Sequence, residues 1–232
     1  MQQIMVTGSN RGIGLAVVAE YLATDDDVVI YACCRHPEAA DGLQKLQNDY
    51  PDQLMIVPLE VTKQASIEAA FEQIHAKTAS LDVLINNAGI DPPNQTLKTI
   101  TAETMLDTYA VNTVAPLMIS QAFLPLLKSG SKLIHISTSM ASLSERTYGG
   151  NYGYCSSKAA LNMMMRGLAS DLRSHHITTI ALDPGWARTD MGGQSAAISP
   201  EESAQGIVSV ISSLTMDDNG RYLRYDGLES AW

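Results

Sequence analysis

Short apolar runs alternate with longer segments of helical periodicity, and this alternation constrains the fold more than any other feature of the chain. The apolar runs, rich in Val and Ile, lie at residues 4–6, 28–34, 54–59, 81–86, 132–137 and 178–183. Segments with helical spacing begin near Ile13, Pro37, Gln64, Ala102, Tyr152 and Pro200. Continuously apolar strands are typical of a sheet covered on both faces, and crossovers of this length make it parallel. The pattern predicts an α/β fold with a doubly wound parallel sheet of about seven strands, the run 221–225 forming an edge.

The organisation along the chain indicates one unit. A length of 232 residues suits one sizeable domain, and no linker, internal repeat or low-complexity tract divides it. We therefore expect residues 1–232 to form a single domain of the Rossmann type. The segments 91–100, 140–151 and 187–199 each follow the carboxyl end of a strand, where open α/β sheets bind their ligands.

The net charge and the cysteines limit the kinds of partner and metal site that this chain is expected to have. The formal net charge is −10 and no block of Lys or Arg interrupts it, which disfavours nucleic acid and anionic membranes as partners. No apolar run is long enough to cross a bilayer, and Met1 leads almost directly into a strand, so we expect no membrane association. Cys33 and Cys34 are adjacent in a strand and no Cys/His cluster suggests a metal. Reduced thiols in a cytoplasmic protein are the simplest interpretation.

A glycine-rich turn, "TGSNRGIG" at residues 7–14, joins the first strand to the first helix. Gly8, Gly12 and Gly14 permit a tight turn and close approach of the backbone to a pyrophosphate at the helix N-terminus. The spacing differs from the G-x-G-x-x-G of the general dinucleotide fingerprint. A glycine-rich turn without a ligand is the alternative, which the strand–turn–helix context disfavours.

The end of the second strand indicates which dinucleotide is bound. NAD sites usually carry an acidic residue there for the ribose 2′-hydroxyl, whereas this strand ends in Cys34 followed by Arg35. Arg11 supplies a second guanidinium, and two such planar cations suit a 2′-phosphate. We therefore predict NADP(H) as the cofactor. The alternative is that both arginines are solvated surface residues.

Tyr154 stands four residues before Lys158 in a segment of helical spacing. The two side chains then share one helix face, and a nearby ammonium favours the phenolate. If the spacing is functional, Lys158 lowers the pKa of Tyr154, which would suit proton transfer near neutral pH. The alternative is an accidental spacing of two ordinary helix-surface residues, which only the rest of the chain can decide.

With TGxxxGxG and YxxxK both present, the chain resembles a short-chain dehydrogenase/reductase along essentially its whole length. "NNAG" at 86–89, "VNTVAP" at 111–116, "ISTS" at 136–139 and "DPGWARTDM" at 183–191 match the other motifs of that family in order. Within the family, "DPGWARTDMGG" and the final "NGRYLRYDGLESAW" are most similar to C-factor and sniffer-type carbonyl reductases.

The resemblance implies a set of site residues. Tyr154 would be the proton donor, Lys158 would lower its pKa and hold the nicotinamide ribose, and Asn112 would steady a water that links Lys158 to solvent. The expected cofactor contacts are Gly8, Asn10, Arg11, Gly12, Ile13, Gly14, Arg35, Glu60, Val61, Asn87, Ala88, Gly89, Tyr154, Lys158, Pro184, Gly185, Ala187 and Thr189.

Two positions depart from the family pattern. The family usually has Ile-Ser-Ser where this chain has Ile136, Ser137 and Thr138, so either Thr138 or the following Ser139 supplies the catalytic hydroxyl. Threonine is stiffer at χ1 because it is β-branched. Glu60 stands where an aspartate commonly meets the adenine.

The function that this resemblance implies is NADPH-dependent reduction of small aldehydes, ketones or quinones. A non-catalytic NADP(H)-binding regulator is the main alternative, and an NAD-linked alcohol dehydrogenase is a third. Ser142, Leu143 and Trp186 are the expected substrate-pocket residues. Relatives associate through the helices around 102–124 and 152–173, so the resemblance also implies a homodimer or homotetramer.

Overall fold

Seven parallel strands form one sheet in the computed structural model, which describes all residues from Met1 to Trp232. The strands are β1 (Gln2–Thr7), β2 (Val28–Cys34), β3 (Leu54–Pro58), β4 (Leu81–Asn86), β5 (Leu127–Ile136), β6 (Thr178–Asp183) and β7 (Tyr222–Arg224). Their order across the sheet is β3-β2-β1-β4-β5-β6-β7, with every neighbouring pair parallel. The predicted doubly wound parallel sheet and its edge strand at β7 are therefore confirmed.

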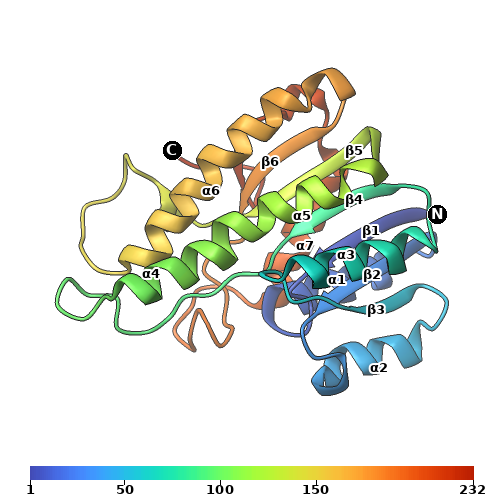
Figure 1. Ribbon diagram of the computed structural model, residues 1–232, viewed down its shortest axis with the longest axis horizontal. Coiled ribbons are helices and arrows are strands. Elements are labelled where there is room, and N and C mark those ends of the chain that lie inside the picture. Colours follow the sequence, from blue (N-terminus) through green and yellow to red (C-terminus); the bar gives the residue numbers. More distant parts are fainter.

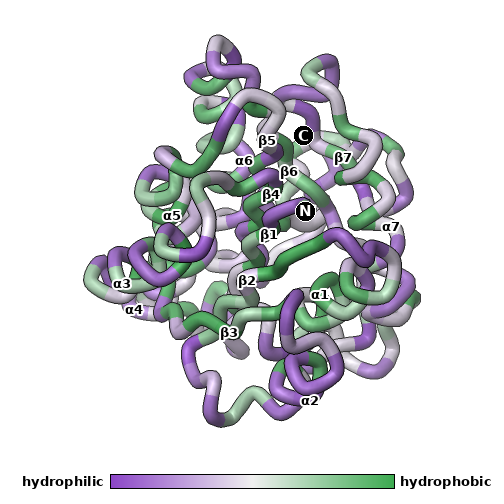
Figure 2. Tube along the Cα trace, turned by 90° about the vertical axis from the view of Figure 1, so that its right-hand side faces the viewer, coloured by the Kyte–Doolittle hydropathy of each residue, from purple (hydrophilic) through white to green (hydrophobic).

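Helices cover both faces of this sheet (Figures 1 and 2). One face carries α1 (Gly12–Thr24), α2 (Asp41–Asp49) and α7 (Pro200–Ser213). The other carries α3 (Gln64–His75), α4 (Ala102–Tyr109), α5 (Ala115–Phe123) and α6 (Tyr152–Asp171). Each layer has its own core. Cys34 lies in the cluster beneath α1 and α7, and Cys33 in the cluster beneath α3 and α5, as alternation along a strand requires.

Two differences from the sequence-based expectation have a clear structural cause. β5 begins at Leu127, before the polar residues 128–131, because Leu81 of β4 pairs with Leu127 ahead of a register shift. The helical segment expected from Ala102 is divided into α4 and α5 by a π-helical turn, η2 (Ala110–Val114). Hydrophobic periodicity predicted the helix, but it carries no signal for the extra residue of a π turn.

The strand order reverses between β1 and β4. Ligands of doubly wound sheets bind in the crevice outside the carboxyl ends of the strands at such a point. The segments that meet here are the glycine loop (residues 7–14), the β4 loop (87–101), the β5 loop (137–151) and the β6 loop (184–199). None of the helices combines the length and apolarity needed to cross a bilayer.

Candidate active site

The glycine loop packs directly on the end of β4. Gly8 has a positive φ of 64°, and a β-carbon there would lie 2.8 Å from the Cα of Ala88, which a side chain cannot tolerate. The Asn87 side-chain amide donates to the backbone oxygens of Thr7 at 2.9 Å and Gly8 at 3.0 Å. A β-carbon on Gly14 would lie 2.4 Å from the Gly8 oxygen. These contacts hold residues from two predicted cofactor motifs in one rigid cradle.

The N-terminus of α1 opens into this cradle. Arg11 precedes the helix without forming a capping hydrogen bond, and the first turn contains no acidic residue. The first N–H groups of a helix have no partner within it and favour an anion. The backbone at Gly12, Ile13 and Gly14 therefore forms a site suited to a phosphate group, beside the exposed side chain of Asn10.

Both arginines predicted to bind the 2′-phosphate are exposed, and each faces a carboxylate. Arg11 Nη1 lies 2.8 Å from Asp190 Oδ2 in the β6 loop, and Arg35 Nη1 lies 3.8 Å from Glu60 Oε2. Exposed pairs of this kind contribute about 0–1 kcal/mol, so an incoming phosphate can compete for either guanidinium. The Glu60 carboxylate also accepts a hydrogen bond from the Thr62 hydroxyl at 3.1 Å. Its contact with adenine, and that of the neighbouring buried Val61, stay predictions.

The π turn η2 carries Asn112, which is fully buried. Its side-chain oxygen accepts from the Ile90 N–H at 2.8 Å, and its amide donates to the Ile90 carbonyl at 2.9 Å and to Ser157 Oγ at 3.1 Å. Asn112 thus ties the β4 loop to α6. A β-carbon on Gly89 would sit 3.3 Å from Asn112 Oδ1 and 3.4 Å from Lys158 Nζ, so Gly89 leaves room between these two groups.

The first two turns of α6 carry Tyr154 and Lys158, both largely buried. Lys158 Nζ donates to the Ile136 carbonyl at the end of β5 at 2.7 Å. Asn151, just before the helix, has a left-handed φ of 46° and makes no capping bond. Gln95 of the β4 loop supplies the cap instead, accepting from the Tyr154 N–H at 2.8 Å.

Burial dominates the ionisation of this pair. It raises the pKa of Tyr154, an effect that hydrogen bonding from the Thr138 side chain opposes and that Asp91 and Asp183 reinforce. Burial lowers the pKa of Lys158 to about 8. For the chain itself, the prediction that Lys158 lowers the Tyr154 pKa is therefore wrong. Desolvation in this dry position disfavours the phenolate more than its neighbours favour it.

The lowered Lys158 pKa predicts a pH effect on stability. Between about pH 8 and 10.5 the folded chain releases a proton that the unfolded chain still binds, so this group makes stability rise with pH in that window. Below it, the full cost of burying the ammonium remains. We expect the stability of the wild type relative to Lys158→Met to increase by about 2 kcal/mol from pH 7.5 to pH 10, measured by urea unfolding. The exposed Lys128→Met is the control, and a difference independent of pH would contradict the expectation.

The β5 loop brings a hydroxyl group to Tyr154. Thr138 is nearly buried, and its side chain lies near enough to Tyr154 to oppose the rise in the pKa of the phenol. Ser139 is exposed, and its backbone N–H lies near enough to the buried Asp183 carboxylate to oppose the rise in the pKa of that group. The same carboxylate accepts from the Gly185 N–H at 3.1 Å and so fastens the β5 loop to the β6 loop.

The β6 loop is cross-braced and lies over the glycine loop. A bridge between Ala187 and Ile198 closes it, and the indole N–H of Trp186 donates to the Gly192 carbonyl at 2.8 Å. A β-carbon on Gly12 would lie 3.3 Å from the Thr189 methyl group. At its start the Pro184 carbonyl accepts from Ser203 of α7 at 2.6 Å.

The predicted pocket residues differ in their surroundings. Leu143 and Trp186 are 80% and 57% exposed at the rim of the crevice. Ser142 is buried and its hydroxyl donates to the main-chain oxygen of Trp232 at 3.1 Å. This hydrogen bond braces the β5 loop. Ser142 also lines a pocket of about 140 Å³, together with other residues of the β5 loop such as Ser139 and Arg146.

Sequence reasoning missed two residues that position this site, Gln95 and Asp183. Gln95 is distant in sequence from the helix that it caps, and no local pattern marks it. Asp183 had a signal, because a carboxyl group at the end of an apolar strand is costly unless hydrogen bonds satisfy it. No group of His, Cys, Asp or Glu side chains in the structure is placed to hold a metal ion.

Comparison with known proteins gives a consistent result. Residues 2–198 match the family model described as short chain dehydrogenase. The chain is 40% identical to the C-signal protein of Myxococcus xanthus over 67% of its own length and 95% of that protein. It is 32% identical to an uncharacterized oxidoreductase of Schizosaccharomyces pombe, covering 96% of this chain and 94% of the relative.

Solved structures extend the likeness over the whole fold. The NADPH-bound carbonyl reductase from chicken fatty liver superimposes with a TM-score of 0.94 at 40% identity, covering 100% of this chain and 99% of that one. The carbonyl reductase Sniffer of D. melanogaster gives a TM-score of 0.95 at 34% identity, with 100% of both chains covered. The match of family model, relatives and structures places this chain in the short-chain dehydrogenase/reductase family.

Proposed function

We propose that this protein is an NADPH-dependent reductase of small carbonyl compounds. The observation that carries the proposal is the meeting of Tyr154, Lys158, Asn112 and Thr138 at the carboxyl ends of the central strands, beside the glycine loop. A proton donor, a buried cation and a hydroxyl group thus adjoin a phosphate cradle. The similar carbonyl reductase from chicken fatty liver binds NADPH, which supports the same assignment.

The residues present fit the cofactor. Gly8 and Gly14 leave no room for a β-carbon because the glycine loop packs tightly on itself and on Asn87 and Ala88. A glycine turn between a strand and a helix is the element that presents its backbone to a pyrophosphate in dinucleotide sites. The uncapped N-terminus of α1 favours its charge, and Arg11 and Arg35 are exposed for a 2′-phosphate. Ala187 and Thr189, in the β6 loop above Gly12, would contact the nicotinamide end.

Bound NADPH would supply the hydride, and the chain would supply the proton and its position. Because burial raises the Tyr154 pKa, its phenol stays protonated at neutral pH and can donate to the substrate oxygen as negative charge develops there. Thr138, rather than the exposed Ser139, would donate a second hydrogen bond to that oxygen. Lys158, with its pKa of about 8, and Asn112 would return a proton to Tyr154 after each turnover.

The side chains around the entrance of the crevice favour substrates with an apolar body. Large apolar side chains stand exposed on the loops around the crevice: Leu143 at 80%, Tyr148 at 53%, Trp186 at 57% and Met191 at 50%. Exposed apolar clusters commonly mark binding sites. Aldehydes, ketones or quinones with an apolar body would cover these side chains, and polar sugars would not.

The test is the loss of NADPH absorbance across a panel of aldehydes, ketones and quinones. We expect turnover that favours members with aromatic or aliphatic bodies over hydroxylated analogues of similar size. Tight NADPH binding with no turnover on any compound would overturn the proposal. It would favour the non-catalytic NADP(H)-binding regulator instead.

Self-association stays a prediction. Leu106 of α4, Val114 of η2 and Met163 of α6 are 71%, 51% and 75% exposed, respectively. Burying these side chains between two copies would remove apolar surface from water, which supports a homodimer or homotetramer through this layer.

A further inference from the structure

After β7 the chain turns back and ends beside the β5 loop and α6 (Figure 1). We call residues 226–232 the tail. It runs antiparallel to β7, with a bridge between Leu223 and Glu229 and a hydrogen bond from the Ser230 N–H to the Tyr222 carbonyl at 2.8 Å. The tail is thus an ordered element attached to the edge of the sheet.

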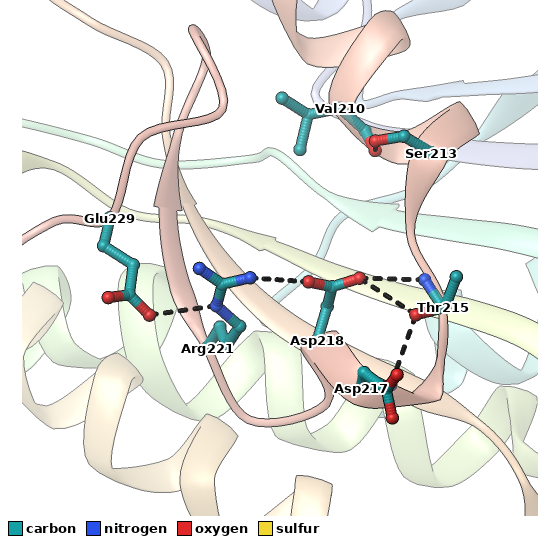
Figure 3. Close-up of polar contacts among 7 residues, drawn as sticks. All are labelled: Val210, Ser213, Thr215, Asp217, Asp218, Arg221 and Glu229. Atoms are coloured by element: carbon teal, nitrogen blue, oxygen red, sulfur yellow. Dashed lines mark hydrogen bonds and ion pairs between the residues drawn. The ribbon is translucent and has the colours of Figure 1, made fainter.

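A chain of ionic contacts fixes the tail at its middle (Figure 3). Arg221 lies between two carboxylates, donating to Asp218 at 2.7 Å and to Glu229 at 2.9 Å. Asp218 in turn forms a capping box with Thr215. Because Arg221 is bonded on both sides, it anchors the tail more firmly than an isolated surface pair would.

The end of the tail holds the β5 loop. The main-chain oxygen of Trp232 accepts hydrogen bonds from Ser142 Oγ at 3.1 Å, Ser144 Oγ at 2.8 Å and the Ser144 N–H at 3.0 Å. The centroid of the Trp232 ring lies 5.3 Å from that of Tyr222 and 5.5 Å from the Arg166 guanidinium of α6. Trp232 therefore joins the β5 loop, the edge strand and the helix that carries Tyr154 and Lys158.

Tyr222 connects the same region to the reacting groups. It is only 1% exposed, and its hydroxyl donates to the main-chain carbonyl of Thr138. The Thr138 side chain lies beside Tyr154, where it opposes the rise in the pKa of the phenol. A single residue of the edge strand thus fixes the backbone from which the proposed carbonyl-binding hydroxyl projects.

We propose that Tyr222 and Trp232 are positioning residues for carbonyl reduction, which clamp the β5 loop so that the Thr138 hydroxyl faces Tyr154. This inference rests on the proposed function for its catalytic consequence. Neither residue touches the predicted cofactor cradle, so the clamp acts on the carbonyl substrate and not on NADPH binding.

The test compares Tyr222→Phe with Tyr31→Phe. Tyr31 is also buried at 1% exposure and its hydroxyl donates to Gln3 at 2.9 Å, but it lies in β2 on the other side of the switch point. Both variants lose one buried tyrosine hydroxyl. We expect Tyr222→Phe to lower kcat for carbonyl reduction about 5- to 10-fold, with the dissociation constant of NADPH within about 2-fold of wild type. Tyr31→Phe should leave both constants unchanged.

Hydrogen exchange of the peptide spanning residues 138–146 separates this inference from the proposed function. In Tyr222→Phe and in Trp232→Ala we expect its amides to exchange about 5- to 10-fold faster than in wild type, while peptides of the glycine loop stay unchanged. If the wild type reduces no carbonyl compound but both variants show this faster exchange, the proposed function is contradicted and the clamp is retained. Unchanged exchange together with unchanged kcat in Tyr222→Phe would overturn the clamp.

Discussion

Replacing Tyr154 with Phe is expected to lower kcat/KM for carbonyl reduction about 10²- to 10⁴-fold, the usual contribution of a positioned general acid. The phenol is buried beside the Thr138 hydroxyl, where water has little access to take over its role. The substitution removes one oxygen and keeps the ring, so the packing of α6 and the cofactor cradle should survive. Steady-state kinetics at saturating NADPH, with NADPH binding measured by fluorescence, gives the result.

Tyr152→Phe provides a matched control, because Tyr152 begins the same helix two residues earlier and residues two apart do not share a helix face. Its kcat/KM should stay within about 2-fold of wild type. Turnover by Tyr154→Phe that equals that of Tyr152→Phe would show that another group donates the proton.

Replacing Arg35 with Asp is expected to weaken NADPH binding about 100-fold and to leave NADH binding within about 3-fold. A charge-assisted hydrogen bond is worth about 1.5–3 kcal/mol, and the new carboxylate adds repulsion of the 2′-phosphate. NADH carries a 2′-hydroxyl there, which an acidic residue at the end of β2 can accept. Titration of both cofactors, with the ratio of their dissociation constants as the measure, tests the assignment.

Arg173→Asp makes the same change of charge at an exposed position near the opposite ends of the strands. The ratio of the NADPH and NADH dissociation constants of Arg173→Asp should match that of the wild type. This control distinguishes a local contact of Arg35 from an effect of net charge. An unchanged ratio in Arg35→Asp would remove Arg35 from the 2′-phosphate site and leave Arg11 as the candidate.

Much of the fold follows from local sequence. The Val- and Ile-rich runs specify strands covered on both faces, and the helical spacing between them specifies crossovers, so parallel topology follows with little freedom. The glycine loop could also be predicted, because its glycines stand between a strand and a helix. The structure accounts for two of them, since Gly8 packs against Ala88 and Gly14 against Asn87. The π turn at Asn112 was not, since its extra residue leaves the apolar pattern nearly unchanged.

The arrangement of groups at the site depended on the tertiary structure. Sequence spacing placed Tyr154 and Lys158 on one helix face. The upward shift of the Tyr154 pKa follows from burial, which no spacing encodes. Gln95 caps α6 from another loop, and Trp232 bonds to Ser144 across the edge of the sheet. The sequence by itself determined the sheet, the cradle and the reactive residue types. Only the tertiary structure determined how far these residues are buried and which hydrogen bonds position them, because both depend on contacts between segments far apart in the chain.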